Sequence, residues 1–372
     1  MFVPDEEVKT EKTCCTDVSC CISEKKDKIL NEQYITGWIN TGVGDIPQVA
    51  THLTNKDKWE HFKIRIAIGR TKYKVDPGIY AVGTPSPGSP VLVSANYKLS
   101  FDALRKELKG LDAWIVVLDT KGINVWCAAG KGTFGTEELV GRIEAVELKK
   151  IVNHKKLIVP QLGAPGISAH KVKKLSGFTV IYGPVRARDI PEFLNANMKA
   201  AAEMRKVSFT LPDRLVLIPM ELVQGFRHFV LISAAFFFLS GLSGNGYSLE
   251  LAGAVGSRAA LNILLIYLGA SALGFLLLPW LPGRSFYFKG LIVGIILFAI
   301  SFATHLSGSG ILEPLAWLLL ISALSSFIVM NITGSSHYTS FSGVKKEMRF
   351  ALPLQIGAAV PGSLLWILSR FF

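Results

Sequence analysis

The chain has 372 residues, of which 50% are hydrophobic and 18% are charged, and its formal net charge is +12 at pH 7. This length accommodates two ordinary domains, and the hydrophobic share is high for a soluble protein. The positive charge suits an anionic membrane surface or an acidic partner. Nucleic acid is not expected as a partner, because neither a basic–aromatic RNA motif nor zinc-finger spacing accompanies the charge.

Charge is distributed unevenly along the chain. Residues 1–225 carry 32 of the 40 Lys and Arg residues and 25 of the 28 Asp and Glu residues, whereas residues 226–372 carry 8 and 3. We therefore expect a disordered, cysteine-containing tail over 1–30, a folded binding domain over 31–210 and a transmembrane domain over 211–372. The first 30 residues have no apolar central segment, so we expect no secretory signal.

Five apolar runs divide the last part of the chain. Each approaches the ~20 residues that a helix needs to cross the hydrocarbon core of a bilayer. A buried helix of a soluble protein would be shorter and would keep a polar face. The expected transmembrane helices are 219–242, 258–281, 286–306, 312–333 and 351–372. A four-span or re-entrant arrangement is the alternative.

Basic residues lie on alternate sides of these spans. They precede the first span and occupy the second and fourth connections, at Arg186, Arg188, Lys199, Arg205, Lys206, Arg214, Arg284, Lys289, Lys345, Lys346 and Arg349. The first and third connections, 243–257 and 307–311, contain no Lys or Arg. The positive-inside rule then predicts a multi-pass protein of the cytoplasmic (inner) membrane. Its N-terminus and soluble domain are expected to be cytoplasmic and its C-terminus outside.

Strands and helices alternate in the middle of the chain. We expect strands over 91–97, 114–118, 157–159 and 178–182, and helices over 101–108, 136–149, 168–175 and from Asp189 onward. This order predicts a parallel, doubly wound sheet that binds its ligand at the carboxyl ends of the strands. Upstream, alternating apolar residues predict further strands over 61–68, 73–75 and 79–82.

Cys127 is the only cysteine beyond residue 21, and it lies in a tight, glycine-flanked stretch after the strand 114–118. One interpretation is a small buried hydrophobe beside Trp126. The other is a reactive thiol, because Ala128, Ala129 and Gly130 permit close approach by a large flat group. Lys131 favours the thiolate, the form of cysteine that binds metals.

The run Gly130–Gly135 fits the letters of a G-x-G-x-x-G dinucleotide motif. Such a motif should follow its strand immediately, and an acidic residue should end the next strand. Here roughly ten residues intervene and the next strand ends at Pro160-Gln161, so NAD binding is disfavoured. A P-loop is disfavoured too, because Val125 replaces its first glycine and Gly132 its Ser or Thr.

Two vicinal cysteine pairs lie in the tail, and Glu313 borders an apolar run. Thiolates suit soft metals, but the spacing matches neither a zinc ribbon nor a ferredoxin. Soft-metal capture by Cys14, Cys15, Cys20 and Cys21 therefore stands beside an unstructured tail as an alternative. Glu313 is expected at a membrane interface unless it faces the bundle interior, where an ionisable group indicates function.

The stretch Asn124–Lys131 resembles the cap-helix motif of the mercury-methylating corrinoid proteins, the HgcA family. The segments Pro90–Lys98 and Val159–Gly166 resemble other parts of the same corrinoid-binding domain. That domain is shared with the large subunit of the corrinoid iron–sulfur protein of the acetyl-CoA pathway. The resemblance covers about residues 31–210, and the five spans extend it to the end. The tail cysteines do not match the cluster of the iron–sulfur relative, and no TIM barrel is present.

The resemblance implies a Rossmann-like α/β corrinoid-binding domain followed by an all-α membrane domain of five transmembrane helices. It implies a cobalamin-type corrinoid bound base-off, with Cys127 as the catalytic residue and the axial ligand of cobalt. The residues expected around the corrinoid are Asn124, Val125, Trp126, Cys127, Ala128, Ala129, Gly130, Lys131, Thr133, Thr136, Gly163 and Gly166.

The activity that the resemblance implies is a methyltransferase reaction that forms methylmercury from inorganic Hg(II). A thiolate donating to methyl-cobalt would favour departure of the methyl group with its electrons, which electrophilic Hg(II) requires. The partners implied are a small ferredoxin with two 4Fe–4S clusters (HgcB-type) as reductant, a methyl-donor protein from the folate pathway, Hg(II) and the lipid bilayer.

Two alternatives remain beside mercury methylation. One is a membrane-anchored corrinoid carrier that delivers methyl groups to another enzyme, as in the acetyl-CoA pathway. The other is a transporter with a ligand-sensing cytoplasmic domain. The spans disfavour transport, because they show no obvious inverted repeat and few intramembrane charges.

Overall fold

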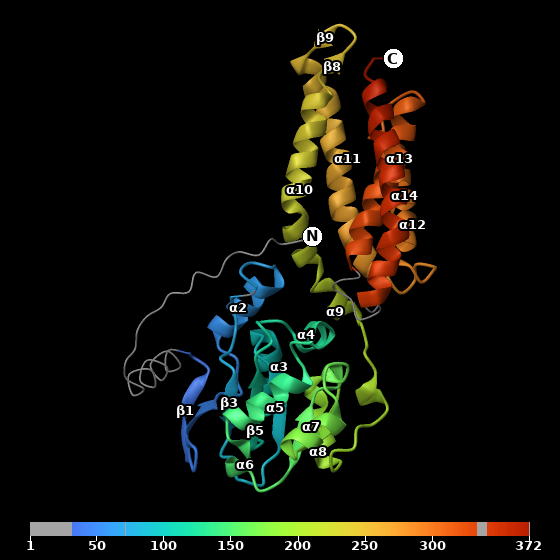
Figure 1. Cartoon of the computed structure of the whole chain (residues 1–372). Helices are drawn as coiled ribbons and strands as arrows, with labels where there is room; N and C mark the ends of the chain where they lie inside the picture. The colour runs from blue at the N-terminus through green and yellow to red at the C-terminus, as the bar shows by residue number, and fades with distance from the viewer. Residues whose placement is uncertain (1–31, 71, 333–340, 372) are drawn as a thin grey trace, which may run out of the picture. The chain divides into compact units, whose positions relative to one another are not determined.

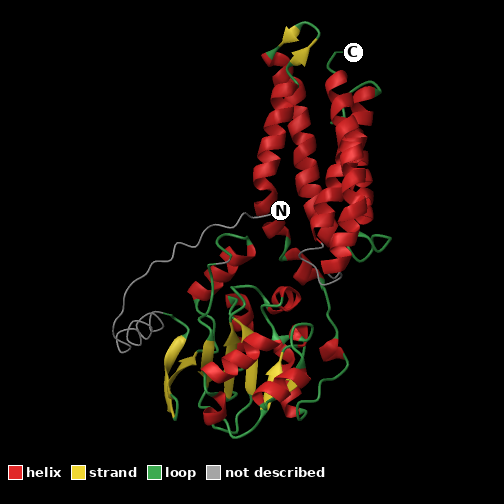
Figure 2. Ribbon diagram, viewed as in Figure 1, coloured by secondary structure: helices red, strands yellow, loops and turns green. Residues whose placement is uncertain are grey.

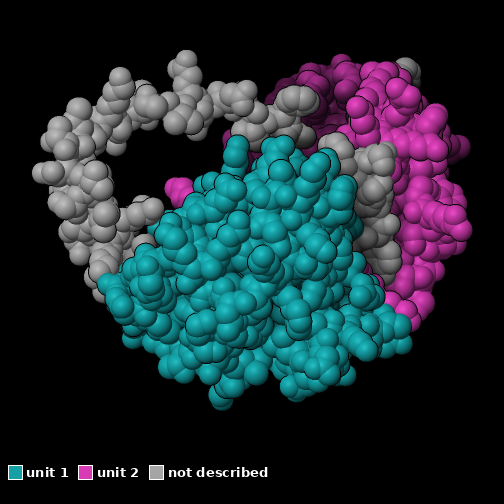
Figure 3. Space-filling view, turned by 60° about the horizontal axis from the view of Figure 1, so that its bottom comes forward, with its two compact units in different colours: residues 1–58, 74–205 teal, residues 59–73, 206–372 magenta. Residues whose placement is uncertain are grey.

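The computed structural model describes residues 32–70, 72–332 and 341–371. The chain divides into two compact units (Figure 3). Unit 1 comprises the described part of residues 1–58 together with residues 74–205, and unit 2 comprises residues 59–73 and 206–372. The two units are described separately below.

Unit 1 is built on a seven-stranded sheet with the order β1-β2-β3-β5-β4-β6-β7 (Figure 1). Its strands are β1 (Ile35–Thr41), β2 (Gly44–Val49), β3 (Gly78–Val82), β4 (Val91–Ala95), β5 (Ala113–Leu118), β6 (Lys156–Val159) and β7 (Thr179–Tyr182). The four strands β5, β4, β6 and β7 are mutually parallel, and β3 joins β5 antiparallel. The hairpin β1–β2 completes the sheet, with β2 parallel to β3.

Helices cover both faces of this sheet (Figure 2). The helices that lie wholly in unit 1 are α3 (Lys98–Glu107), α4 (Val125–Lys131), α5 (Thr136–Ala145), α6 (Leu148–Ile151), α7 (Ala169–Ser176) and α8 (Ile190–Asn195), with 3₁₀ turns at Gln161–Gly163, Ala187–Asp189 and Glu203–Arg205. Helix α2 (Asn55–Arg65) begins in unit 1 and continues into unit 2. Apolar residues of α3 and α8 pack with one face of β3, β4, β5 and β6. Helices α5 and α7 contact each other on the opposite side, where Leu139 and Val172 are fully buried. Every residue of β4 and β5 is buried, as expected for strands covered on both faces.

The expected parallel, doubly wound sheet is only partly confirmed. The four parallel strands are present, but β1 and β3 make antiparallel pairs, so the sheet is mixed. The expected strand at 61–68 is wrong, because residues up to Arg65 belong to α2. Residues 73–75 form a single bridge, Lys74 to Tyr97, instead of a strand. The expected helix 136–149 is divided into α5 and α6 at Glu147, which has a φ of 48°.

Unit 2 contains five long apolar helices. They are α10 (Ile218–Leu239), α11 (Leu249–Leu276), α12 (Phe286–Ala303), α13 (Leu312–Asn331) and α14 (Phe341–Leu368), preceded by the short α9 (Leu211–Leu215). The hairpin β8 (Leu242–Ser243) and β9 (Gly246–Tyr247) joins α10 to α11. Five helical stretches within 211–239, 249–276, 286–303, 312–331 and 343–368 are long and apolar enough to cross a membrane.

Small residues allow close packing in this bundle. A Cβ atom at Gly290 would lie 2.7 Å from the backbone of Ser326, and one at Gly294 would lie 2.7 Å from the backbone of Ser322. Close backbone approach of this kind is typical of helix packing in membranes. Glu313, expected at an interface, is buried and forms ion pairs with Arg258 and Arg370, so it takes part in an ion-pair network within the unit.

A buried network of four charges links α2 to α3 in unit 1. Lys98 donates to Asp57 at 2.6 Å and to Asp102 at 2.8 Å. Arg105 donates to Asp57 at 3.0 Å and to Asp102 at 2.7 Å, and its remaining guanidinium nitrogen bonds the carbonyl oxygen of Ala50 at 2.6 Å. Burial by itself raises the pKa of Asp57, but the hydrogen bonds and the positive charges of Lys98 and Arg105 outweigh it and hold this pKa well below its usual range.

Replacing Asp102 with Ala should cost about 3–5 kcal/mol of unfolding free energy, because two buried cations would then share one carboxylate. Hydrogen exchange of α3 in the full-length protein under increasing urea measures this loss. Glu147→Ala is the control, because its ion pair with Lys150 is largely exposed and should contribute at most about 1 kcal/mol. Equal losses in the two variants would contradict a dominant role for the buried network.

Candidate functional site

The residues around Cys127 form a short helix, α4, with a side-chain cap at its start. Asn124 has extended backbone angles and accepts a hydrogen bond from the Cys127 backbone N–H to its Oδ1 at 2.9 Å. Asparagine is among the preferred residues at this position, because its side chain satisfies a backbone donor that the helix leaves unpaired. The helix ends at Gly132, whose left-handed conformation (φ 84°) suits a residue without a Cβ atom.

Asn96 fixes the loop that leads into α4. It follows β4, is almost fully buried, and its Oδ1 accepts from the backbone N–H groups of Thr120 at 3.1 Å and Gly122 at 2.9 Å. Its Nδ2 donates to Asp119 at 3.0 Å. The Thr120 hydroxyl lies 2.8 Å from Asn96 Oδ1 and 2.7 Å from the Ile123 carbonyl oxygen, so it donates to one of them at a time. One amide thus joins the carboxyl ends of β4 and β5.

The sequence did not predict a role for Asn96, although this residue lies in the segment Pro90–Lys98 that resembles the corrinoid-binding domain. A polar residue directly after a largely apolar strand was the available signal, because such residues gather at the ligand edge of parallel sheets. The strand order places β6 on the other side of β4 from β5, so the connections diverge at the β4–β6 boundary. This divergence creates the crevice in which open α/β sheets bind ligands.

Helix α4 has an inward and an outward face. The inward, buried residues are Val125, Ala128 and Ala129. The outward residues are Trp126 and Cys127, which are half-buried, and Gly130 and Lys131, which are exposed. The inward residues hold the helix against the domain, and the free thiol lies on the face that another molecule can reach.

Gly163 and Gly166 pack the turn after β6 against the segment that follows α4. A Cβ atom at Gly166 would lie 2.1 Å from the Phe134 carbonyl oxygen and 3.1 Å from the Ala129 Cα atom. A Cβ atom at Gly163 would lie 2.4 Å from the Phe134 ring. Both positions therefore require glycine for packing, and this requirement is independent of any ligand contact.

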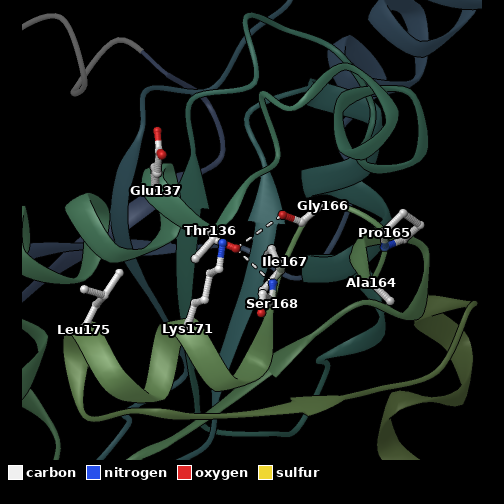
Figure 4. A pocket seen from close by; sticks show the side chains of 9 residues that line it. All are labelled: Thr136, Glu137, Ala164, Pro165, Gly166, Ile167, Ser168, Lys171 and Leu175. Atoms are coloured by element: carbon white, nitrogen blue, oxygen red, sulfur yellow. Dashed lines mark hydrogen bonds between the residues drawn. The ribbon is translucent and has the colours of Figure 1, made fainter.

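A cavity of about 520 Å³ opens between the first turns of α5 and α7 (Figure 4). Its lining residues are Thr136, Glu137, Ala164, Pro165, Gly166, Ile167, Ser168, Lys171 and Leu175. The Ser168 backbone N–H donates to Thr136 Oγ1 at 2.9 Å, and the Thr136 hydroxyl lies 3.5 Å from the Gly166 carbonyl oxygen. In Figure 4 the Lys171 side chain extends from α7 toward Thr136. The Lys171 ammonium is offset by the Glu137 carboxylate, which also lines the cavity, so the two helix N-termini are what favours an anion here.

The expected site residues are thus distributed over two neighbouring features. Thr136 and Gly166 line the cavity, and Cys127 lies on the outward face of α4, outside the cavity lining. The Thr133 hydroxyl is 3.5 Å from the Ala128 carbonyl oxygen at the end of α4. Cys14, Cys15, Cys20 and Cys21 lie outside the described residues. Across the described ranges, no group of three or more His, Cys, Asp and Glu residues could hold a metal ion.

The part of the chain that carries this site is similar to a known protein family. Residues 65–194 match the CdhD family, described as CO dehydrogenase/acetyl-CoA synthase delta subunit. We call this matched stretch the CdhD domain. It begins at the end of α2 and finishes within α8, so the CdhD domain includes Asn96, Cys127 and the cavity. The five long apolar helices lie outside it.

Curated relatives resemble the chain over the same length. The acetyl-CoA decarbonylase/synthase complex subunit gamma of Methanopyrus kandleri is 32% identical over 127 residues, and subunit gamma 2 of Methanosarcina thermophila is 33% identical over 132 residues. The corrinoid/iron-sulfur protein large subunit of Moorella thermoacetica is 28% identical over 127 residues. Each match covers 34% of this chain, and the chain spans only 27–28% of the length of these relatives.

Asn124→Ala should loosen the first turn of α4 by about 1 kcal/mol, because the Cys127 backbone N–H loses its acceptor. Asn124→Ser should retain most of the stability, since serine caps helices nearly as well. Hydrogen exchange at the Cys127 amide measures the change. Equal protection in the Ala variant and the wild type would show that the cap does not hold the helix.

Gly166→Ala should destabilise the CdhD domain, because its methyl group would overlap the Phe134 carbonyl oxygen. Gly130→Ala is the matched control. A Cβ atom at Gly130 meets nothing within 4 Å, and alanine in a helix is favoured over glycine by roughly 1 kcal/mol. Thermal unfolding of both full-length variants should therefore shift in opposite directions. A harmless Gly166→Ala change would contradict the close packing described here.

Proposed function

We propose that this chain is a membrane-anchored corrinoid protein that transfers methyl groups to inorganic Hg(II). The observation that carries the proposal is the half-buried free thiol of Cys127 on the outward face of a capped helix, within the CdhD domain. The choice of Hg(II) as the substrate rests on the resemblance of Asn124–Lys131 to the HgcA cap-helix motif.

The residues around the thiol suit a corrinoid. Sulfur is a donor that binds a transition metal as thiolate. Gly130 leaves open space beside the outward face of α4, and Trp126 offers an apolar surface there. The anionic nucleotide tail of a base-off corrinoid would suit the cavity between α5 and α7, where Thr136, Ser168 and Lys171 provide polar groups. The cavity has room for part of the cofactor, and the remainder would lie against α4.

The roles of individual residues follow from their positions. Cys127 would hold the cobalt through its thiolate, and Asn124 would fix the turn that carries Cys127. Lys131 would offset the negative charge near the thiolate. Val125, Ala128 and Ala129 would act by anchoring α4. When bound, the corrinoid would supply a methyl group that can leave with its bonding electrons, and Hg(II) would accept it.

The membrane part of the proposal rests on the five long apolar helices. We propose that they span the cytoplasmic membrane with the CdhD domain on the cytoplasmic side and the C-terminus outside, following the alternation of basic residues in their connections. A two-cluster ferredoxin as reductant, a folate-linked methyl donor and Hg(II) are the partners that complete the proposed cycle.

A methyl carrier is the second candidate. The relatives are named as subunits of an acetyl-CoA decarbonylase/synthase complex and as the large subunit of a corrinoid/iron-sulfur protein. These names favour a protein that passes methyl groups to another enzyme. In this case Cys127 could still hold the corrinoid, but Hg(II) alone would not accept the methyl group.

Cys127→Ala should abolish methylmercury formation in full-length protein supplied with methylcobalamin, reductant and Hg(II), because the axial sulfur is lost. Cys127→Thr should still bind the corrinoid, which the visible spectrum reports independently of turnover. Wild-type activity in Cys127→Ala would overturn thiolate ligation. The same protein tested with Hg(II) alone separates the two functions, because a carrier would remain methylated until a partner enzyme is added.

A further inference from the structure

A short segment of unit 2 exposes large apolar side chains. This segment, residues 59–70, contains Trp59, Phe62 and Ile68, which are 57%, 51% and 53% exposed. The rings of Trp59 and Phe62 are stacked with centroids 5.4 Å apart, so they form one continuous apolar surface. Large aromatic groups are normally buried in soluble domains, so such a surface indicates a binding partner.

Positive charge surrounds this apolar surface. Residues 56–70 contain the cations Lys56, Lys58, Lys63, Arg65 and Arg70, and the acids Asp57 and Glu60. Asp57 is already neutralised inside the buried network with Lys98 and Arg105. The Lys63 ammonium lies 5.4 Å from the centroid of the Trp59 ring, so cationic and aromatic groups share one side of α2. The segment therefore offers apolar rings with a basic rim.

Contacts within unit 2 place the segment beside the start of the first long apolar helix. Arg70 donates from Nη1 to the sulfur of Met220 at 3.1 Å, and Met220 lies in the first turn of α10. The same end of the bundle carries a second aromatic–cation pair. Trp280 is 71% exposed, and the guanidinium of Arg214 lies 5.5 Å from its ring centroid while bonding backbone carbonyls at the end of α11.

We propose that residues 59–70 rest on the surface of an anionic lipid bilayer, with Trp59 and Phe62 at the headgroup level and Lys63 and Arg65 contacting anionic headgroups. Trp side chains gather at membrane–water interfaces, and each Lys or Arg near an anionic leaflet contributes about 1 kcal/mol. A lipid surface is favoured over a protein partner because the segment contacts the end of a helix that is itself proposed to enter the bilayer. The inference rests on that proposed membrane insertion.

The test uses the full-length protein in nanodiscs containing anionic phosphatidylglycerol. Single cysteines replace Phe62 or Ile68 in a background in which Cys14, Cys15, Cys20, Cys21 and Cys127 are substituted, and each carries an environment-sensitive fluorophore. We expect blue-shifted emission and quenching by nitroxides attached near the lipid headgroups. Lys63→Gln and Arg65→Gln should each lower the ratio of lipid-bound to free segment by roughly five-fold, matching the loss of one cation.

Two matched positions separate the possible outcomes. Leu175→Cys on α7 is 58% exposed and should remain aqueous, whereas Ile295→Cys on α12 is 51% exposed and should report deep lipid. Aqueous labels at 62 and 68 with a lipid-exposed label at 295 would overturn this inference alone. An aqueous label at 295 would overturn membrane insertion as well. Shielding at 62 that appears only after adding the ferredoxin would assign the surface to a protein and also overturn it.

Discussion

The candidate site depends on two asparagine side chains that replace missing backbone partners. Asn96 uses both halves of its amide, because its oxygen accepts from the loop at Thr120 and Gly122 and its nitrogen donates to Asp119. An aspartate there would repel Asp119, and an apolar residue would leave buried donors unsatisfied. Asn124 then caps the helix that the loop introduces. The backbone that carries Cys127 is therefore held by one side chain at the end of β4 and by another in the loop after β5.

Tight packing of small residues in the rest of the domain also holds α4 in position. Gly166 and Gly163 bring the turn after β6 against Phe134, so the segment after α4 cannot move without disturbing β6. The inward face of α4 adds Ala128 and Ala129, which leave no long side chain to reorganise. The inward face of α4 is therefore tightly packed, whereas the outward face around Cys127 is open. A metal ligand held in this way can impose its position on a cofactor instead of adapting to it.

The sequence was sufficient for features that depend on local pattern. Strand β5 is a continuous apolar run and β4 is apolar except for Ser94, and the motif around Cys127 predicted a helix by resemblance. The sequence was insufficient where contacts between residues far apart in the chain determine the local structure. Alternation from His61 to Ile68 indicated a strand, but α2 is anchored through Asp57 to Lys98, forty-one residues away. The antiparallel insertion of β3 and the role of Asn96 likewise arise from contacts between separate elements, which periodicity does not encode.

The two proposed reactions make different demands on access to the bound cofactor. In both, the open space at Gly130 and the half-buried thiol of Cys127 would be covered by the corrinoid. Hg(II) is a small ion and would need only a narrow approach to the methyl group, whereas a carrier must admit another enzyme to it. The match to the CdhD family covers residues 65–194, and the long apolar helices lie after it in the chain. A domain that is held at a membrane, as proposed for this chain, would meet large partners only where that membrane leaves room, a restriction that does not apply to a small ionic substrate.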